Sequence, residues 1–513
     1  MDEKKKGLKW RKPHLQSIQI KGSSSSTTSQ FKEEEEFLSP SSRLLHEPNF
    51  NLYIIAISGL KTPIDPQIVK SNLPHTLLKH PRFSSLQVVD EKDQNKMKWV
   101  KTQVDLENHI VVPKLDENIE NTDKWVEDYI HELSKTTITM SQPLWDMHLL
   151  NLKTKDAESV GVLRAHHSLG DGTSLMSLLL ACTRQTSDPN ALPTIPTAGR
   201  SKMKRAQQLK NGRFERFVMG IWWFVGLVLN TVIDVLMFIA TTAFWKDTET
   251  PLKGGDGVEF TPRRFVWRNL SLDDFKLVKN AMNATINDVA LGATQAGLSR
   301  YLNRKYGEEK MNEEEEASEV KNNLPKNIRL RATLLINIRP VAGIQALADM
   351  MEKDTKAKWG NWIGYVLLPI TIAIKDDPLD YVREAKSTVD RKKHSLEAFF
   401  TFCIADIFLK LFGIKKASGL SHRAIHNTTM CFSNLVGPQE ELTFYGHQLA
   451  YIAPSSYNQP HALMINFQSY AQKMSVVVSV DEGTIPDPHQ LIDDIVVSFN
   501  LIKQAAISSP NLI

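Results

Sequence analysis

Cysteine is scarce in this chain: only Cys182, Cys403 and Cys431 occur among 513 residues. The number is odd and the spacings are not those of metal ligands, so the sequence predicts neither a disulfide framework nor a zinc site. Few cysteines also favour a reducing compartment. No resident metal and no cofactor are expected.

An excess of charge of one sign is also missing. The formal net charge is +4 and no zinc-finger or RNA-binding signature occurs, so nucleic acid is not an expected partner. The first residues, MDEKKKGLKWRKPH, contain no apolar run of a secretory signal, which predicts a chain that begins in the cytosol. With 42% hydrophobic and 23% charged residues, the chain has a globular composition, and its length suggests two domains with additional segments.

Long apolar runs are absent except at residues 217–245. This segment, FVMGIWWFVGLVLNTVIDVLMFIATTAFW, is long enough to span a bilayer and holds one charge, Asp234. Asn230, Asp234 and Thr241 fall on one helical stripe. We expect a re-entrant or interfacial hairpin, or helices in the headgroup region with this stripe toward protein or water. A true span and packing inside a soluble core are the alternatives.

The most informative stretch is ESVGVLRAHHSLGDGTSLMSLLLAC, residues 158–182. Residues 160–165 have the apolar character of a short strand, and the leucines after position 174 recur at helical spacing. Thr173 or Ser174 is the expected N-cap of that helix. The stretch therefore predicts a strand followed closely by a helix.

Two adjacent histidines, His166 and His167, stand where this strand should end. Gly170 and Gly172 bracket Asp171, which would allow a tight or left-handed turn that holds a carboxylate near an imidazole. Imidazole, with an unperturbed pKa of about 6.5, is largely neutral in the cytosol and can take a proton from a hydroxyl as that oxygen attacks an acyl group. The alternative is a pair of half-buried histidines, with Asp171 only capping the next helix.

The HHxxxDG pattern resembles that of the wax ester synthase/diacylglycerol acyltransferase family, within the CoA-dependent acyltransferases that include chloramphenicol acetyltransferase and condensation domains. The resemblance extends from about residue 38 to the C-terminus. It implies an α/β fold, with two chloramphenicol acetyltransferase-like lobes and their mixed sheets around a central tunnel, plus the apolar helical segment. Both halves meeting at one tunnel argues against a true membrane span.

The resulting domain prediction has four parts. Residues 1–37 form a disordered tail, residues 38–200 an N-terminal lobe with the HHxxxDG motif, residues 201–255 a linker with the apolar membrane-associating segment, and residues 256–513 a C-terminal lobe. The tail contains a basic run, a serine and threonine tract and an acidic run, a composition that cannot bury a core.

Further short segments match the family and mark candidate substrate contacts. Each also has a structural alternative: a turn proline with core residues, a helix cap, or an ordinary ion pair. Arg339 in particular is expected to pair with a carboxylate or with a CoA phosphate. The candidates are Pro143, Leu144 and Trp145, then Asn287 and Asp288, Asn337 and Arg339, and finally Ser433 and Asn434 in a loop after a strand at residues 428–432.

The resemblance also implies roles within the motif. His167 is the general base, His166 supports the local structure, and Asp171 forms a structural ion pair rather than a relay, with Gly172 completing the motif. Acyl-CoA and a long-chain fatty alcohol, or diacylglycerol, are the implied substrates. The membrane surface is the implied partner, with the endoplasmic reticulum as location, a cytosolic active site, and the plasma membrane as a second location.

Three rivals differ from this hypothesis. A soluble acyltransferase of small alcohols also uses HxxxDG, but the Asp-Phe-Gly-Trp-Gly segment of the plant enzymes of that kind is absent and the apolar segment is unexpected. A non-catalytic lipid-binding membrane protein would leave the histidines unexplained. A zinc site at His166 and His167 lacks further ligands, and adjacent residues on a strand point apart.

Overall fold

A computed structural model describes residues 36–93, 96–116, 118–194, 213–311, 322–339 and 359–508. The expected disordered tail, up to residue 35, and residues 201–212 of the expected linker region lie outside these residues. At the first described residues, Phe37 forms a bridge with Lys98, and the backbone N–H of Leu38 donates to Met97 O at 2.8 Å. The chain from Glu36 onward forms one compact unit, so the predicted boundary between two lobes stays a prediction.

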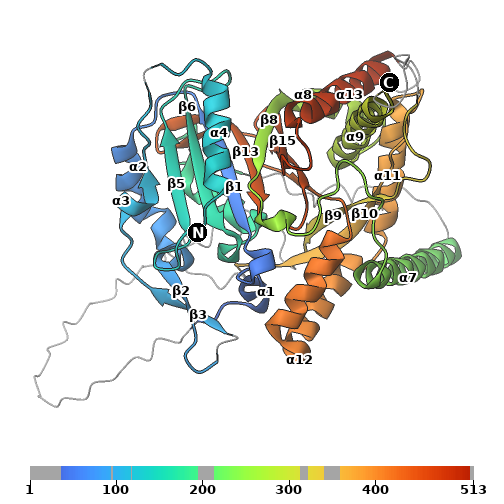
Figure 1. Cartoon of the computed structure of the whole chain (residues 1–513), viewed down its shortest axis with the longest axis horizontal. Coiled ribbons are helices and arrows are strands. Elements are labelled where there is room, and N and C mark those ends of the chain that lie inside the picture. The colour runs from blue at the N-terminus through green and yellow to red at the C-terminus, as the bar shows by residue number, and fades with distance from the viewer. Residues whose placement is uncertain are drawn as a thin grey trace, which may run out of the picture. The chain divides into compact units, whose positions relative to one another are not determined.

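A seven-stranded sheet holds the HHxxxDG motif (Figure 1). Strands β1 and β6 are antiparallel neighbours at its centre, with Tyr53 opposite His166. Strand β13, from late in the chain, pairs with the other edge of β1 and so completes a sheet begun by the N-terminal half. In spatial order the strands are β4 (Ile110–Val111), β5 (Trp145–Leu150), β6 (Ser159–His166), β1 (Tyr53–Leu60), β13 (His447–Tyr457), β12 (Leu442–Phe444) and β7 (Thr183–Gln185).

A six-stranded sheet is built entirely from the C-terminal half. Strand β11 runs parallel to both of its neighbours, β9 and β14, whereas the other pairs are antiparallel, so this sheet is mixed. Strand β13 of the first sheet also contacts β14 and β15, which brings the two sheets together. The order is β10 (Ile363–Ile370), β9 (Leu330–Asn337), β11 (Met430–Leu435), β14 (Leu463–Tyr470), β15 (Lys473–Val480) and β8 (Arg264–Ser271).

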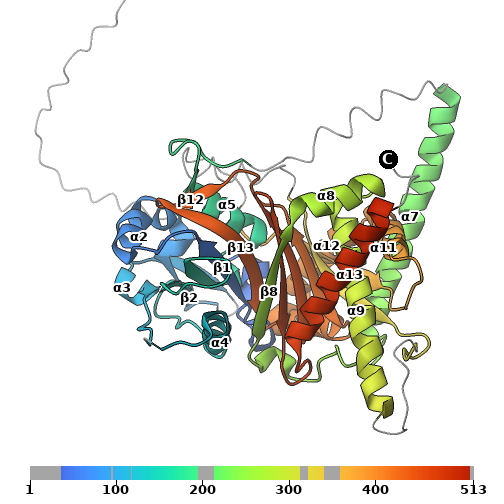
Figure 2. The same ribbon diagram turned by 90° about the horizontal axis from the view of Figure 1, so that it is seen from above.

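The α-helices cover the two sheets. Helices α8, α9, α11 and α13 supply the largest apolar core with the second sheet, and Figure 2 shows α8, α9 and α13 against one side of it. The α-helices are α1 (Pro40–Leu44), α2 (Pro66–Asn72), α3 (Leu106–His109), α4 (Thr122–Ser134), α5 (Gly172–Cys182), α7 (Arg213–Ala243), α8 (Leu272–Ala281), α9 (Ile286–Met311), α11 (Leu379–Lys393), α12 (Glu397–His426) and α13 (Pro488–Ser508).

Short 3₁₀ turns and a small hairpin complete the fold. Strands β2 (Ser85–Val89) and β3 (Met97–Lys101) pair with each other as a separate two-stranded sheet. The 3₁₀ turns are η1 (Pro48–Phe50), η2 (Leu73–His75), η3 (Leu77–Lys79), η4 (Pro81–Ser84), η5 (His167–Leu169) and η6 (Val258–Phe260).

The apolar segment forms α7, a single continuous helix, so the expected hairpin is wrong. Of the described residues, only the Phe217–Ala243 part of α7 is long and apolar enough to cross a membrane, and most of it is exposed. The polar stripe does face protein, as expected for the other alternative. Asp234 is 1% exposed and pairs with Lys392 at 2.9 Å and with Arg391 at 3.0 Å, both from α11. A buried carboxylate therefore ties the middle of α7 to the protein.

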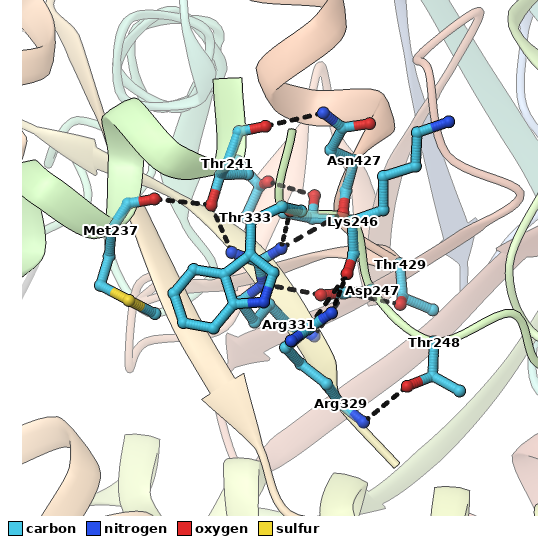
Figure 3. Close-up of polar contacts among 12 residues, drawn as sticks. Met237, Thr241, Lys246, Asp247, Thr248, Arg329, Arg331, Thr333, Asn427 and Thr429 are labelled. Atoms are coloured by element: carbon cyan, nitrogen blue, oxygen red, sulfur yellow. Dashed lines mark hydrogen bonds and ion pairs between the residues drawn. The ribbon is translucent and has the colours of Figure 1, made fainter. Parts of the chain in front are cut away.

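Arg331 ties the C-terminal end of α7 to the second sheet (Figure 3). Its Nε donates to Asp247 Oδ1 at 2.6 Å, one Nη donates to Trp245 O at 2.7 Å, and the other donates to Thr241 Oγ1. Asn427 Nδ2, just after α12, donates to Thr241 O at 2.7 Å. A buried guanidinium such as that of Arg331 needs hydrogen-bonding partners. This network therefore fixes the position of the C-terminal end of α7 on the second sheet.

Candidate active site

The backbone around the motif follows the expected strand-to-helix order. Strand β6 ends at His166, and the His167 N–H donates to Leu52 O at 2.9 Å just before β1. Helix α5 then begins at Gly172. Its N-cap is Asp171, whose Oδ1 accepts from the Ser174 N–H at 2.9 Å, so the prediction that Thr173 or Ser174 caps this helix is wrong.

His167 lies on the wall of a cavity of about 790 Å³. Both sheets contribute to this cavity, together with α1, α5 and α12, and most of the side chains that line it are apolar. Among them are leucines and methionines from β5, β6, α5 and β14. Volumes of this size are typical of sites for organic ligands, and the lining suits a hydrocarbon chain.

Asn361 fixes the hydrogen-bonding state of the His167 ring. Its Nδ2 donates to His167 O at 3.0 Å and to Ser42 Oγ at 3.1 Å. A carbonyl oxygen can only accept, so the amide must turn its Oδ1 toward His167 Nδ1, which lies 3.2 Å away and must therefore carry the proton. Nε2 is then unprotonated and can accept a proton. It has no hydrogen-bond partner among the described residues.

Burial lowers the pKa of His167 below its ordinary value, against smaller opposing contributions that include Asp171 and Asn361. Its side chain is 8% exposed. The imidazole is therefore neutral at cytosolic pH, the form that a general base needs.

His166 is separated from the cavity and fully buried. Its Nε2 donates to Leu45 O at 3.1 Å, and its Nδ1 lies 2.6 Å from Ser168 Oγ. The ring also packs against Tyr53, at 5.0 Å between centroids. Burial lowers its pKa well below the ordinary value. These contacts are those of a supporting residue.

Asp171 forms a buried ion pair with Arg339, at 2.8 Å between Oδ2 and Nη2. The same carboxylate accepts from the Trp362 N–H at 3.2 Å, and no hydrogen bond joins it to His167. Arg339 also donates to Ser174 Oγ at 2.9 Å. Arg339 therefore has a carboxylate partner, one of the two partners expected for it, and the pair links the start of α5 to the segment just after β9.

The motif glycines are needed for space rather than for a left-handed turn. Gly170 has φ 167°, an extended value that any residue can adopt. A Cβ there would lie 2.9 Å from Ser174 Cβ and 3.1 Å from Trp359 Nε1, which donates to Leu169 O at 2.7 Å. A Cβ on Gly172 would lie 3.3 Å from Leu435. Glycine therefore lets the turn approach neighbouring side chains closely.

The segment Pro143–Trp145 does not line the cavity, and its expected contact with substrate stays a prediction. Leu144 and Trp145 are buried in the core. The Trp145 Nε1–H donates to Phe83 O at 2.9 Å, and the ring packs against His109. The alternative interpretation, a turn proline followed by two core residues, describes this segment.

The remaining candidate residues are divided between the cavity and a helix cap. Asn337, Ser433 and Asn434 line the cavity, the last two as part of strand β11 rather than of a loop. Asn287 does not line it, but its Oδ1 accepts from Asn434. Asp288 is buried, and its Oδ2 accepts from the Thr285 N–H at 2.7 Å, while its own N–H donates back to Thr285 Oγ1. That is a capping box.

Sequence inspection missed the role of Asn361. The segment WGNWIG around it stood out only for its glycines before a strand, and nothing local links it to a histidine 194 positions earlier. Within the described residues, no cluster of three or more histidine, cysteine or acidic side chains is placed to hold a metal ion.

Solved structures with the same arrangement define the class of fold. A wax ester synthase/diacylglycerol acyltransferase from Marinobacter aquaeolei VT8 matches 92% of this chain and 100% of its own, with a TM-score of 0.57 at 16% identity. The first condensation domain of the CDA synthetase matches 88% of this chain and 91% of its own, with a TM-score of 0.52 at 12% identity. The chain thus has the fold shared by condensation domains and that acyltransferase.

Sequence comparison identifies the family. The wax ester synthase/diacylglycerol acyltransferase catalytic domain matches residues 44–290, and the WS/DGAT C-terminal domain matches residues 359–503. Wax ester synthase/diacylglycerol acyltransferase 5 of Arabidopsis thaliana is 52% identical over 92% of this chain and 94% of its own length, and number 11 is 50% identical over 92% and 96%. The chain belongs to the wax ester synthase/diacylglycerol acyltransferase family and is an acyltransferase.

Proposed function

We propose that this enzyme transfers a fatty acyl group from acyl-CoA to a long-chain fatty alcohol, forming a wax ester, and also to diacylglycerol, forming triacylglycerol. The observation that carries the proposal is the neutral imidazole of His167 on the wall of a cavity lined largely by apolar side chains. Acyl-CoA is a substrate here, and no separate cofactor takes part. The relatives from Arabidopsis have names that describe the same two products.

His167 acts as the general base in one direct transfer. Nε2 takes the proton of the acceptor hydroxyl as its oxygen forms a bond to the thioester carbonyl carbon. The carbon–sulfur bond then breaks, and the leaving CoA thiolate receives the proton from the imidazolium. A positioned base of this kind contributes about 10² to 10⁴ fold in rate.

Asn361 is the positioning residue in this mechanism. Its Oδ1 holds the Nδ1 proton, so Nε2 is the nitrogen that accepts, and the same oxygen stabilises the ring when it becomes positive. Asp171 and Arg339 hold the turn and the start of α5 in place through their ion pair. Ordering both substrates in a cavity that excludes water supplies much of the remaining acceleration.

We further propose that the enzyme lies on one leaflet of the endoplasmic reticulum membrane, with the active site on the cytosolic side and the plasma membrane as a second location. Helix α7 has the length and composition of a span, but Asp234 in its middle is paired with Arg391 and Lys392. A transmembrane orientation would take these charges of α11 into the hydrocarbon layer, at high cost. An interfacial helix leaves these charges inside the protein and outside the hydrocarbon layer.

Incubation of detergent-solubilised protein with labelled palmitoyl-CoA and either 1-hexadecanol or diacylglycerol tests the proposal. Wax ester or triacylglycerol is the expected product, and His167→Ala should lower the rate by about 10² to 10⁴ fold without loss of folding. His75→Ala, an exposed histidine in η2, is the matched control. Wild-type rates in purified, folded His167→Ala would refute the mechanism. Absence of ester with either acceptor would refute the function.

A further inference from the structure

The N-terminal half of α12 forms part of the cavity wall. Phe402, Ala405 and Leu409 line the cavity. Their spacing of three and four residues places them on one face of the helix. This half of α12 ends at Gly413, where φ is 75° and the helix kinks.

The adjacent face of the same half-helix is apolar and exposed. Phe399 is 60% exposed, Ile407 is 49% and Leu411 is 70%. Large apolar side chains grouped in this way on a surface usually mark a contact with a partner or a membrane. This half of α12 is therefore largely apolar toward the cavity, where Asp406 is the charged exception, and apolar toward the outside.

Helix α7, which contacts α12, also carries an exposed apolar face. The two helices contact each other, and Figure 1 shows one end of α7 next to α12. Thr231 Oγ1 of α7 accepts from the Leu396 N–H, at the start of α12, at 3.0 Å. Trp222, Phe224 and Leu236 of α7 are all more than half exposed. Together the two helices form one apolar surface, which we call the α7/α12 surface.

Lysines accompany this surface on α12. Lys415 and Lys416 are exposed just beyond the kink and have no carboxylate partner among the described residues. Lys410, also exposed, pairs with Asp406 at 2.6 Å. An apolar face with lysines beside it matches a leaflet that contains anionic phospholipid, because the apolar side chains enter the acyl region while the ammonium groups meet headgroup phosphates.

We infer that α12 is the portal through which the long-chain acceptor reaches His167 directly from the membrane. The α7/α12 surface lies on the leaflet, and the alcohol passes between α12 and α1 into the cavity. Helix α1 packs against α12, and its Pro40, Ser41 and Leu44 line the cavity beside Phe402 and Ala405. This inference rests on the proposed function, since it concerns the acceptor of that reaction.

Chain-length selectivity tests the portal. Ala405→Trp puts a large ring on the cavity side of α12, and Leu277→Trp, at an exposed position on α8 that does not line the cavity, is the control. With palmitoyl-CoA as donor, we expect Ala405→Trp to lower kcat/KM for 1-hexadecanol presented in vesicles by about tenfold or more. The rate with 1-hexanol supplied from water should stay near wild type. Leu277→Trp should change neither rate.

Two outcomes of that experiment would overturn the portal. An unchanged rate with hexadecanol in folded Ala405→Trp means that the acceptor enters elsewhere. An equal loss with both alcohols means that the introduced indole ring obstructs the acyl chain or the reaction centre instead. Both outcomes differ from failure of the proposed function, in which the wild type forms no ester from either alcohol.

Fluorescence tests the membrane contact of α12 itself. In full-length protein with Cys403→Ser, an environment-sensitive dye is attached at Leu411→Cys or, as control, at Leu277→Cys, an exposed apolar position on α8. Vesicles of phosphatidylcholine with phosphatidylserine should shift the emission of the label at 411 to the blue, more strongly than phosphatidylcholine alone, and leave that at 277 unchanged. No shift at 411, or the same shift without lipid as protein concentration rises, would refute the inference; the latter identifies a second copy as occupant.

Discussion

The contact between Asn361 and His167 gives the sharpest test of the active site. Asn361→Asp replaces the neutral acceptor, 3.2 Å from Nδ1, with a carboxylate. An opposite charge at this distance stabilises the imidazolium, so the pKa of His167 should rise by about 1–3 units. A general base works in its unprotonated form, and activity therefore falls as pH drops through its pKa.

The sign and size of the effect follow from the wild-type site. Burial holds the pKa of His167 below the ordinary value of 6.5, so the wild-type enzyme should be on its plateau at neutral pH. Asn361→Asp should move the acid limb of kcat/KM upward by about 1–3 pH units. Asn361→Ala leaves the buried Nδ1–H of His167 without an acceptor, and a buried donor without a partner costs about 1–3 kcal/mol of free energy. We therefore expect kcat/KM to fall by about 10- to 100-fold.

The assay is the pH profile of ester formation from labelled palmitoyl-CoA and hexadecanol. Asn466→Asp is the matched control, since this asparagine is buried, lines the same cavity and donates to Ser455 rather than to His167. Thermal melts of all variants separate lost folding from lost chemistry. An acid limb that stays in place in folded Asn361→Asp, or moves equally in the control, would refute the assignment of Asn361 as the residue that positions the base.

Three other predictions concern stability and assembly. Asp171→Asn keeps an acceptor for the helix cap but leaves Arg339 buried without its carboxylate, so the free energy of unfolding should fall by about 3–5 kcal/mol, with near wild-type activity in the folded fraction; activity lost at unchanged stability would indicate a relay. Gly170→Ala should cost about 1–3 kcal/mol in chemical unfolding because its Cβ meets Ser174, whereas Gly220→Ala, in open space on α7, should not destabilise. Asp234→Ala should detach the middle of α7 and speed its proteolysis; unchanged cleavage would show that the ion pairs to α11 do not hold it.

Features that depend on residues close together in the sequence were easier to predict than features that depend on packing across the fold. Ser271 caps α8, and the Thr285–Asp288 box begins α9, as their spacing indicates, because capping depends on residues three apart. Strands β3 and β4 are close in the sequence, yet they do not pair with each other: β3 pairs with β2, and β4 runs parallel to β5. Pairing partners are chosen by packing across the fold, which no local pattern records.

The sequence by itself determined the family, the position of the histidine motif and the position of one long apolar segment, since these depend on residue types at short spacing. Only the tertiary structure decided that Asn361 contacts the ring of His167, that Asp171 pairs with Arg339, and that Trp145 packs in the core away from the cavity. It also decided which face of α7 and α12 is exposed. Contacts of this kind join segments tens to hundreds of residues apart, and they exist only where the packed sheets and helices bring those segments together.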